Sequence, residues 1–195
     1  MKIFLAILIL IFSLQSLTKA DDISDFEIEG ISLGDNLQDH FTEKEIKNAL
    51  DNPTYYPNPK YKIILFEKEY FQIYEGVQIH FQSKDKKIIV YGIDGNLYFE
   101  EDMSKCYEKK DQIIASLEAM FTDTSSYTQK KNHSADKTGN SKIAQTVFPF
   151  KNDEAIIVSC TDWSEKLNSK GWTDELKVTI ISNTLGDFIN NEAYK

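Results

Sequence analysis

Arginine is absent from this chain of 195 residues, in which 22 lysines face 31 aspartates and glutamates for a formal net charge of -9. Arginine is the usual bidentate partner of phosphate and carboxylate groups. An acidic chain without arginine is a poor match for nucleic-acid binding, and an anionic lipid surface would repel it. Lysine, isoleucine and asparagine are favoured by AT-rich codons, so genome composition explains the missing arginine without a functional reason.

Glycine, proline and cysteine are also scarce, with 8, 4 and 2 residues, and there are 3 histidines. The low glycine and proline content excludes low-complexity classes. The histidines (His40, His80 and His133) do not have the spacing of a metal site, and no EF-hand, G-x-S-x-G or phosphate-cradling glycine motif occurs. We therefore expect neither a metal nor a cofactor, and the missing motifs argue against an enzyme.

The one long apolar run lies at the N-terminus, from Ile3 to Leu14. It follows a short positively charged start, has the length of the apolar part of a signal peptide, and is short for a membrane span. Thr18 and Ala20 then form an acceptable cleavage site. The sequence predicts a signal peptide at 1–20, one domain at 21–195, a periplasmic or secreted location, and no membrane span after cleavage. An uncleaved anchor is the alternative.

Two kinds of periodicity divide the mature chain. Apolar residues at helical spacing predict helices near 35–51, where Thr42 and Glu45 make a capping box, at 106–121, and in a short C-terminal segment at 185–194. β-branched and aromatic residues predict strands at 61–67, 71–82, 86–100, 143–150, 154–161 and 175–182. Within 86–100, Asp94-Gly95 predicts a tight turn between two short strands.

This order of elements predicts an α+β fold in a single domain. Short links favour an antiparallel sheet, with helices packed on one of its faces. The order of helix, strands, helix and strands also allows two degenerate αβββ halves.

The two cysteines, Cys106 and Cys160, predict a disulfide, because cysteines that occur in even number in an exported chain usually form disulfide bonds. Cys106 begins the apolar stripe of the helix at 106–121, and Cys160 shares the strand parity of Ile156 and Val158. A bridge would close a loop of about 55 residues and stabilise the fold by about 4 kcal/mol. The alternative is a reactive thiol at Cys160, which would need a base close by.

Aromatic residues supply most of the candidate binding residues. Trp163 and Trp172 flank a polar loop and would form the platform for a sugar or another ring-shaped ligand; otherwise they cap the end of the sheet. The "YYPNPKY" connector offers three tyrosines (Tyr55, Tyr56 and Tyr61) as a recognition strip or as a rigid packed link.

His80 is the histidine best placed for chemistry. It lies on the polar side of the strand "VQIHF", between Gln78 and Gln82. It is either a solvated strand residue or part of a polar site on an open sheet face, where nearby carboxylates would join it.

The stretches "FEIEGISLGDNLQDHFTEKEI", "IIVSCTDW" and "ELKVTII" resemble a group of uncharacterised small exported proteins of AT-rich marine bacteria. The resemblance covers nearly the whole mature chain, and implies export and a single α+β domain but no activity. "GISLGD" is also faintly similar to small outer-membrane assembly lipoproteins and β-lactamase-inhibitor-like modules, whose lipid-bearing cysteine is missing in this chain.

These observations predict a binding or interaction module of the cell envelope, with an unidentified protein or small molecule as its ligand. The alternative is an envelope hydrolase built around His80 and nearby carboxylates. In a hydrolase His80 and at least one carboxylate should converge in a concave pocket, whereas a binding module should expose an aromatic patch. A purely structural envelope component predicts neither.

Overall fold

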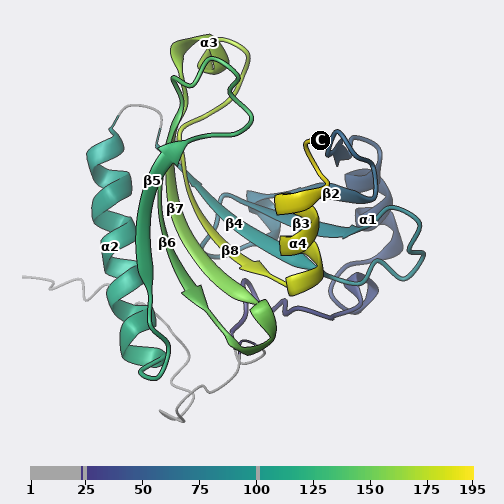
Figure 1. Ribbon diagram of the computed structural model, residues 1–195. Helices are drawn as coiled ribbons and strands as arrows, with labels where there is room; N and C mark the ends of the chain where they lie inside the picture. Colours follow the sequence, from purple (N-terminus) through teal and green to yellow (C-terminus); the bar gives the residue numbers. More distant parts are fainter. Residues whose placement is uncertain (1–22, 24–25, 100–101) are drawn as a thin grey trace, which may run out of the picture.

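Eight antiparallel strands form one strongly twisted sheet with helices on both faces (Figure 1). The computed structural model describes residues 23, 26–99 and 102–195, so the expected signal peptide at 1–20 lies outside the described residues. Within them, the sheet and its helices make a single α+β domain, which confirms the fold class predicted from the order of the elements.

The bounds of the elements follow the sequence patterns closely. The strands are Thr54–Tyr55 (β1), Tyr61–Glu67 (β2), Gly76–Gln82 (β3), Gly92–Tyr98 (β4), Tyr127–Asn132 (β5), Lys142–Pro149 (β6), Ala155–Asp162 (β7) and Glu175–Ile181 (β8). The helices are Glu43–Leu50 (α1), Met103–Met120 (α2), Glu165–Asn168 (α3) and Asn183–Asn191 (α4). Short 3-10 turns occur at Leu37–Asp39 (η2), Lys68–Tyr70 (η3) and Lys151–Asp153 (η4). The predicted capping box of Thr42 and Glu45 starts α1.

Both halves of the sheet have the same arrangement. Helix α1 precedes β1 to β4, helix α2 precedes β5 to β8, and the order across the sheet is β1-β2-β3-β4-β8-β7-β6-β5. The last strands of the two halves, β4 and β8, therefore pair with each other at the centre. The division into two halves is visible in this order, and each half has four strands where three were expected.

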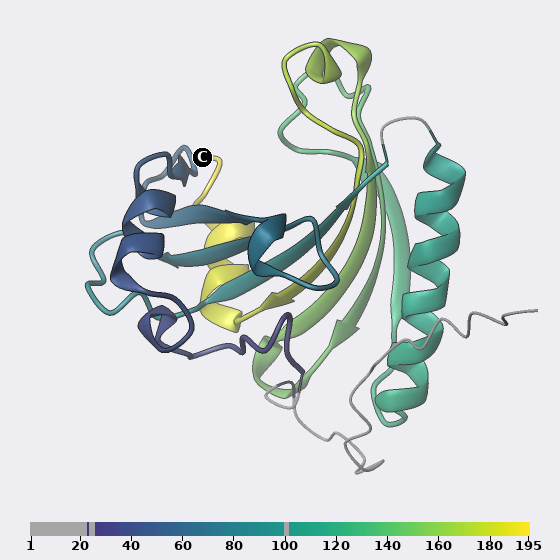
Figure 2. The same ribbon diagram turned by 180° about the vertical axis from the view of Figure 1, so that it is seen from behind.

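The core face of the sheet is the face that α1 and α2 cover. A row of isoleucines crosses its centre, and each is almost completely buried: Ile64, Ile79, Ile93, Ile180 and Ile156. Each such side chain contributes about 2 kcal/mol to folding. Ile46 of α1 and Leu117 of α2 belong to the same buried cluster. Seen from behind, α1 lies in front of β2 and β3, with α4 behind them (Figure 2).

Helix α2 is also linked covalently to the sheet. Cys106 of α2 and Cys160 of β7 form a disulfide with a Cα–Cα distance of 6.1 Å. Both side chains are fully buried. The predicted disulfide is thus confirmed, and Cys160 is not a free thiol.

Helix α4 lies on the opposite face of the sheet. A Cβ on Gly92 would stand 2.6 Å from Leu185 of α4, so only glycine allows the helix to come this close. Phe188 packs on Tyr61 and Tyr56 in a second, smaller buried cluster. The docking of this C-terminal helix through its apolar residues was predicted. The expectation that the helices pack on one face of the sheet holds for α1 and α2 but is wrong for α4.

The turn predicted at Asp94-Gly95 is wrong, because β4 continues through both residues. On the core face, a Cβ at Gly95 would lie 2.6 Å from the ring of Tyr74, which packs directly on the strand. Gly95 therefore allows the ring of Tyr74 to approach the backbone in the middle of the strand, a common role of glycines in strands.

Within residues 23, 26–99 and 102–195, none of the helices combines the length and the apolar character that a bilayer crossing needs.

Candidate functional site

The face opposite the core face carries a row of polar residues, and we call it the polar face. Side chains directly opposite each other on paired strands point to the same side of a sheet. One row across it contains Gln78, Asp94, Thr179, Ile157 and Val147. The next row contains Gly76, Asn96, Lys177, Ser159 and Gln145. The pairing of β4 with β8 thus brings the ionisable residues of the two halves together.

His80 lies at the edge of α4 in a chain of hydrogen bonds. Its Nε2 is 3.0 Å from Oδ2 of Asp94, and its Nδ1 is 2.9 Å from the hydroxyl of Tyr56. A carboxylate only accepts, so Nε2 carries the proton and donates to Asp94, and a neutral ring accepts from Tyr56 at Nδ1. His80 is only 6% exposed, so the strand residue that could have been solvated is buried.

Asp94 is the acceptor at the centre of this chain. The hydroxyl of Thr179 donates to Asp94 Oδ1 over 2.7 Å, and Lys177 Nζ is 3.6 Å from Oδ2. Burial alone would raise the pKa of Asp94, but the charge of Lys177, His80 and the two hydrogen bonds together hold it below its usual value. Asp94 is therefore ionised, and the burial of its charge depends on these neighbours.

Lys177 links Asp94 to a second carboxylate. Its Nζ lies 3.3 Å from Glu175 Oε1 and 3.4 Å from the side-chain oxygen of Gln78, to which it donates. Burial opposes its charge, yet the two carboxylates outweigh burial and raise the pKa of Lys177. Burial raises the pKa of Glu175, and Lys177 offsets only part of that rise. The side chain of Lys177 is 25% exposed, so solvent reaches this cluster at the lysine.

Asn96 lies next to Lys177 on the polar face, and its side chain has no hydrogen-bond partner in the described part of the chain. The residue is 0% exposed, and neither its side-chain oxygen nor its side-chain nitrogen makes a hydrogen bond. Buried polar groups nearly always have a partner, so this amide stands out.

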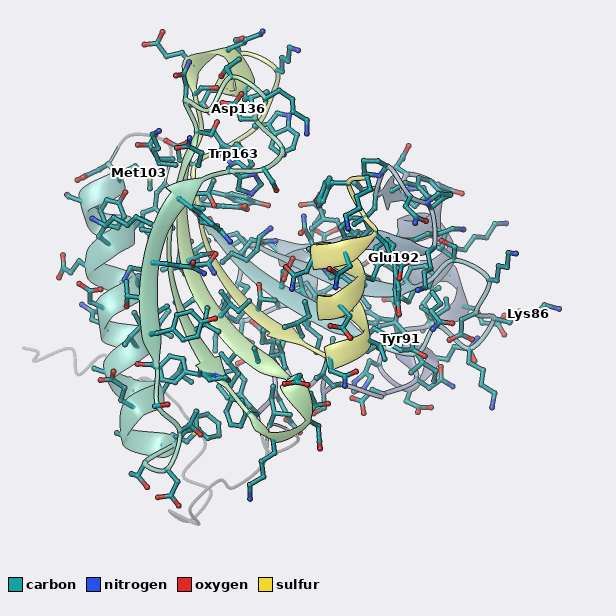
Figure 3. All side chains as sticks on the ribbon, viewed as in Figure 1. Lys86, Tyr91, Met103, Asp136, Trp163 and Glu192 are labelled. Carbon is teal, nitrogen blue, oxygen red and sulfur yellow. A yellow bond between two sulfur atoms is a disulfide. The ribbon has the colours of Figure 1, made fainter. Side chains whose placement is uncertain are left out.

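Two loops project beyond one end of the polar face, where Figure 3 places Asp136 and Trp163. The loop between β5 and β6 is held by Asp136, whose carboxylate accepts from the backbone and hydroxyl of both Thr138 and Ser141 at 2.7–2.9 Å. Ser164 N donates to the Ser141 hydroxyl over 3.0 Å and ties the β7–β8 loop to it. The segment 132–141 is thus held by its own hydrogen bonds.

Three aromatic rings gather in these loops. Trp163 is buried, its ring centroid lies 4.3 Å from His133 and 4.5 Å from Trp172, and its backbone N–H donates to Asp174. Trp172 remains 43% exposed. The two tryptophans thus meet as one cluster, with Trp172 as its accessible member.

His133 is expected to stay neutral at pH values well below those at which a histidine is usually protonated. Burial, followed by the charges of Lys177 and Lys131, lowers its pKa from 6.5 to about 4, against an opposing effect of Asp136. Because the pKa of His133 is lower in the folded chain than in the unfolded chain, its effect on folding depends on pH. The folded chain keeps its full stability above pH 6.5 and loses stability as the pH falls toward about 4. An NMR titration of the imidazole proton checks this, and a midpoint at 6.5 would contradict the packing of His133 on Trp163.

The three candidate tyrosines do not form an exposed strip. Tyr55 is 49% exposed at the edge of the sheet, with Lys62 Nζ 5.4 Å from its ring centroid. Tyr56 and Tyr61 are buried against α4, at 7% and 1% exposure, and Tyr56 bonds to His80 instead. The structure therefore brings Tyr56 into the polar cluster and leaves Tyr55 apart from it.

Sequence reasoning missed Asp94, Lys177, Glu175 and Asn96. The wrong turn at Asp94-Gly95 hid the alternation of Asp94, Asn96 and Tyr98 along one face of β4. On β8, the alternation of Glu175, Lys177 and Thr179 with three buried apolar residues was a readable signal of a second polar strand. Their meeting with His80 depends on the pairing of distant strands.

A separate hollow of about 290 Å³ lies beside the start of α4 and holds none of this cluster. Its lining residues are Leu33, Gly34, Val90, Tyr91, Glu154, Ser182, Asn183 and Thr184. We place the candidate site on the polar face because the buried charges are there. In the described residues, no cluster of histidine, cysteine and carboxylate side chains has the geometry of a metal site.

Neither a protein-family model, nor a curated protein, nor a solved structure matches the chain. The geometry of the polar face is therefore what bears on function.

Proposed function

We propose that the chain is an exported binding module of the cell envelope, and that its polar face receives the ligand. The observation that carries this proposal is the cluster of His80, Asp94, Lys177 and Glu175 on that face. Buried charges cost several kcal/mol each before their mutual attraction repays part of it, so a fold that gathers them serves more than stability. Perturbed ionisable groups concentrate at functional sites.

Exposed aromatic rings lie on the polar face and in the loops beyond its end, as a binding surface requires. Tyr98 and Tyr127 point to the polar face by register and are 37% and 53% exposed. Tyr194 packs edge-on against Tyr56 and is 42% exposed. Burial raises the pKa of Tyr194, and the nearby charge of Lys177 offsets only part of that rise. With Trp172 in the loops, these rings can supply large contact areas at low entropic cost.

The disulfide supports the exported location, because such bonds persist in oxidising compartments. The likeness to small exported proteins of marine bacteria points the same way. Cleavage after Ala20 and a periplasmic or secreted location belong to this proposal.

An envelope hydrolase is the second candidate, and the chain of Tyr56, His80 and Asp94 favours it. This order of hydroxyl, imidazole and carboxylate is the one that activates a nucleophile. Burial and the charge of Asp94, however, raise the pKa of Tyr56, so its hydroxyl stays protonated. The hollow beside the start of α4 contains none of these three residues. The cluster is therefore better suited to holding a binding surface than to chemistry.

Exposed aromatic residues test the binding site with little risk to the fold. We expect Trp172→Ala to weaken binding of the ligand about tenfold, because exposed aromatic anchors carry much of the binding energy. Tyr55→Ala, a change of similar exposure on the core-face side of the sheet edge, should leave binding unchanged. Binding of cell-wall polymers, oligosaccharides and peptides to the mature chain is measured by calorimetry.

The reverse pattern, with loss of binding only in Tyr55→Ala, would move the site to the connector before β2. Hydrolysis of any of these compounds that is abolished in Tyr56→Phe would favour the hydrolase.

A further inference from the structure

We propose that the ligand of the polar face is a glycan chain bearing acetamido groups, and that the side chain of Asn96 pairs with one of those groups. This inference rests on the proposed binding function and names its ligand class. It is carried by the unpaired amide, by the glycine beside it, over which two partly exposed side chains lie, and by the exposed rings of the polar face.

The amide of Asn96 specifies the chemistry of its partner. A carboxamide presents an N–H donor and a C=O acceptor side by side, and an acetamido group presents the complementary pair. Burying such a group without partners lowers the stability of the folded protein. No contact in the described part of the chain compensates for this loss. A ligand that supplies both bonds recovers that cost on binding, and a ligand with a plain hydroxyl in the same place recovers less.

The position of Asn96 leaves a way in. Asn96 stands between Gly76 of β3 and Lys177 of β8. Gly76 has no side chain, and a Cβ there would lie 3.1 Å from Leu65 and 3.3 Å from the hydroxyl of Tyr98. These two side chains therefore cover the space beside Asn96, and both are more than a third exposed, at 36% and 37%. Rotation of a partly exposed ring takes place on a picosecond to nanosecond scale, so Tyr98 can move aside for a ligand.

The surroundings favour a neutral sugar. The faces of aromatic rings carry partial negative charge and attract the weakly positive C–H groups of a sugar ring. Tyr98 and Tyr194 offer such faces near Lys177, and Trp172 offers another in the β7–β8 loop. The net charge of -9, with Asp94 and Glu175 at the centre of the face, disfavours an anionic polymer.

A peptide also carries amides, but the place of Asn96 disfavours it. Extended peptides usually bind by adding a strand to the free edge of a sheet. Asn96 lies on β4, which has β3 on one side and β8 on the other, so no free backbone edge is available there. A peptide partner is treated as an outcome of the test.

The test compares two linear sugars that differ only in the acetamido group. The trimer of β-1,4-linked N-acetylglucosamine and the corresponding glucose trimer are titrated into the mature protein by calorimetry. We expect the acetamido trimer to bind about tenfold more tightly, the value of one or two additional hydrogen bonds. Asn96→Leu, which keeps the branched shape without polar atoms, should abolish this preference.

The melting temperature of Asn96→Leu is a second measurement. It should rise if Asn96 serves the ligand, and should fall if Asn96 serves the fold. Because Asn96→Leu removes two unpaired polar atoms, its melting temperature without ligand should rise. Asn96→Ala, which cannot overpack the site, should also lose the sugar preference. A variant that is less stable and still prefers the acetamido trimer would make Asn96 a structural residue and overturn the inference.

Equal binding of the two trimers would also overturn it, as would a short peptide whose binding depends on Asn96 while neither trimer binds. If neither trimer binds and another ligand is lost in Trp172→Ala, the inference fails and the proposed binding function stands. If no compound responds to Trp172→Ala, the proposed function itself fails.

Discussion

Loss of the Cys106–Cys160 disulfide is expected to lower the free energy of unfolding by about 4 kcal/mol. The bond joins residues 54 apart in sequence and connects α2 to β7. Without it, the unfolded chain gains the freedom of a long open loop, while the folded chain gains little. Since a domain of this size has a total stability of about 5–15 kcal/mol, the loss is a large fraction of the whole.

Urea denaturation of the wild type and of the double variant Cys106→Ala, Cys160→Ala measures this change. A reducing agent serves as the control, because it should destabilise the wild type and leave the double variant unaffected. Intact mass after alkylation, with and without prior reduction, reports the bond directly and also shows whether the purified chain begins at Asp21. A stability change below about 1 kcal/mol would show that α2 is held on the sheet without the bond.

Replacement of Lys177 by methionine is expected to cost about 3 kcal/mol at neutral pH. The change keeps most of the apolar stem but removes the cation between Asp94 and Glu175, whose side chains are only 7% and 12% exposed. The two buried carboxylates then lose the cation between them, and Asp94 keeps only its bonds to His80 and Thr179. Lys47→Met, at an exposed position of α1, is the matched control and should change stability by less than about 0.5 kcal/mol.

The pH dependence separates this electrostatic effect from loss of packing. In the wild type the pKa of Asp94 lies below its usual 3.8, so the stability it contributes is present above that pH and is lost as pH falls below it. Without Lys177 both carboxyl pKa values rise, so protonation relieves the variant as pH falls from 7 toward 4. Denaturation across this range should show a shrinking deficit. A constant deficit would assign the loss to packing, and Glu175→Gln added to Lys177→Met should recover part of it.

Local sequence was sufficient for most of the scaffold. The alternation of Val77, Ile79 and Phe81 fixes the faces of β3, and the shared apolar sides of Cys106 and Cys160 predicted their bond. These inferences need only the period of a helix or strand and the side that carries the apolar residues. The same rule failed at Asp94-Gly95, where a turn signal in the sequence is overruled by the ring of Tyr74 on the strand.

The candidate site depended on information that no local pattern holds. The alternation in β3 placed His80 on a polar side, but only the connector at Tyr56 and the helix at Leu185 bury it. The meeting of β3, β4 and β8 is a matter of strand order and register, which sequence periodicity does not encode. For that reason His80 was found as an isolated candidate, and its partners were not.

The central pairing of β4 with β8 has a consequence for the order in which the protein can be made. Thr179 of β8, which bonds to Asp94 of β4, lies 85 residues later in the chain. The strands β2 to β4 can pair as local hairpins while synthesis continues, but one edge of β4 has no partner until the last strand arrives. Long-range pairing of this kind is slow, and an open strand edge invites pairing with other chains. A chain truncated before β8 should therefore aggregate through that edge, which makes the C-terminal strand the protein's own protection against self-association during biogenesis.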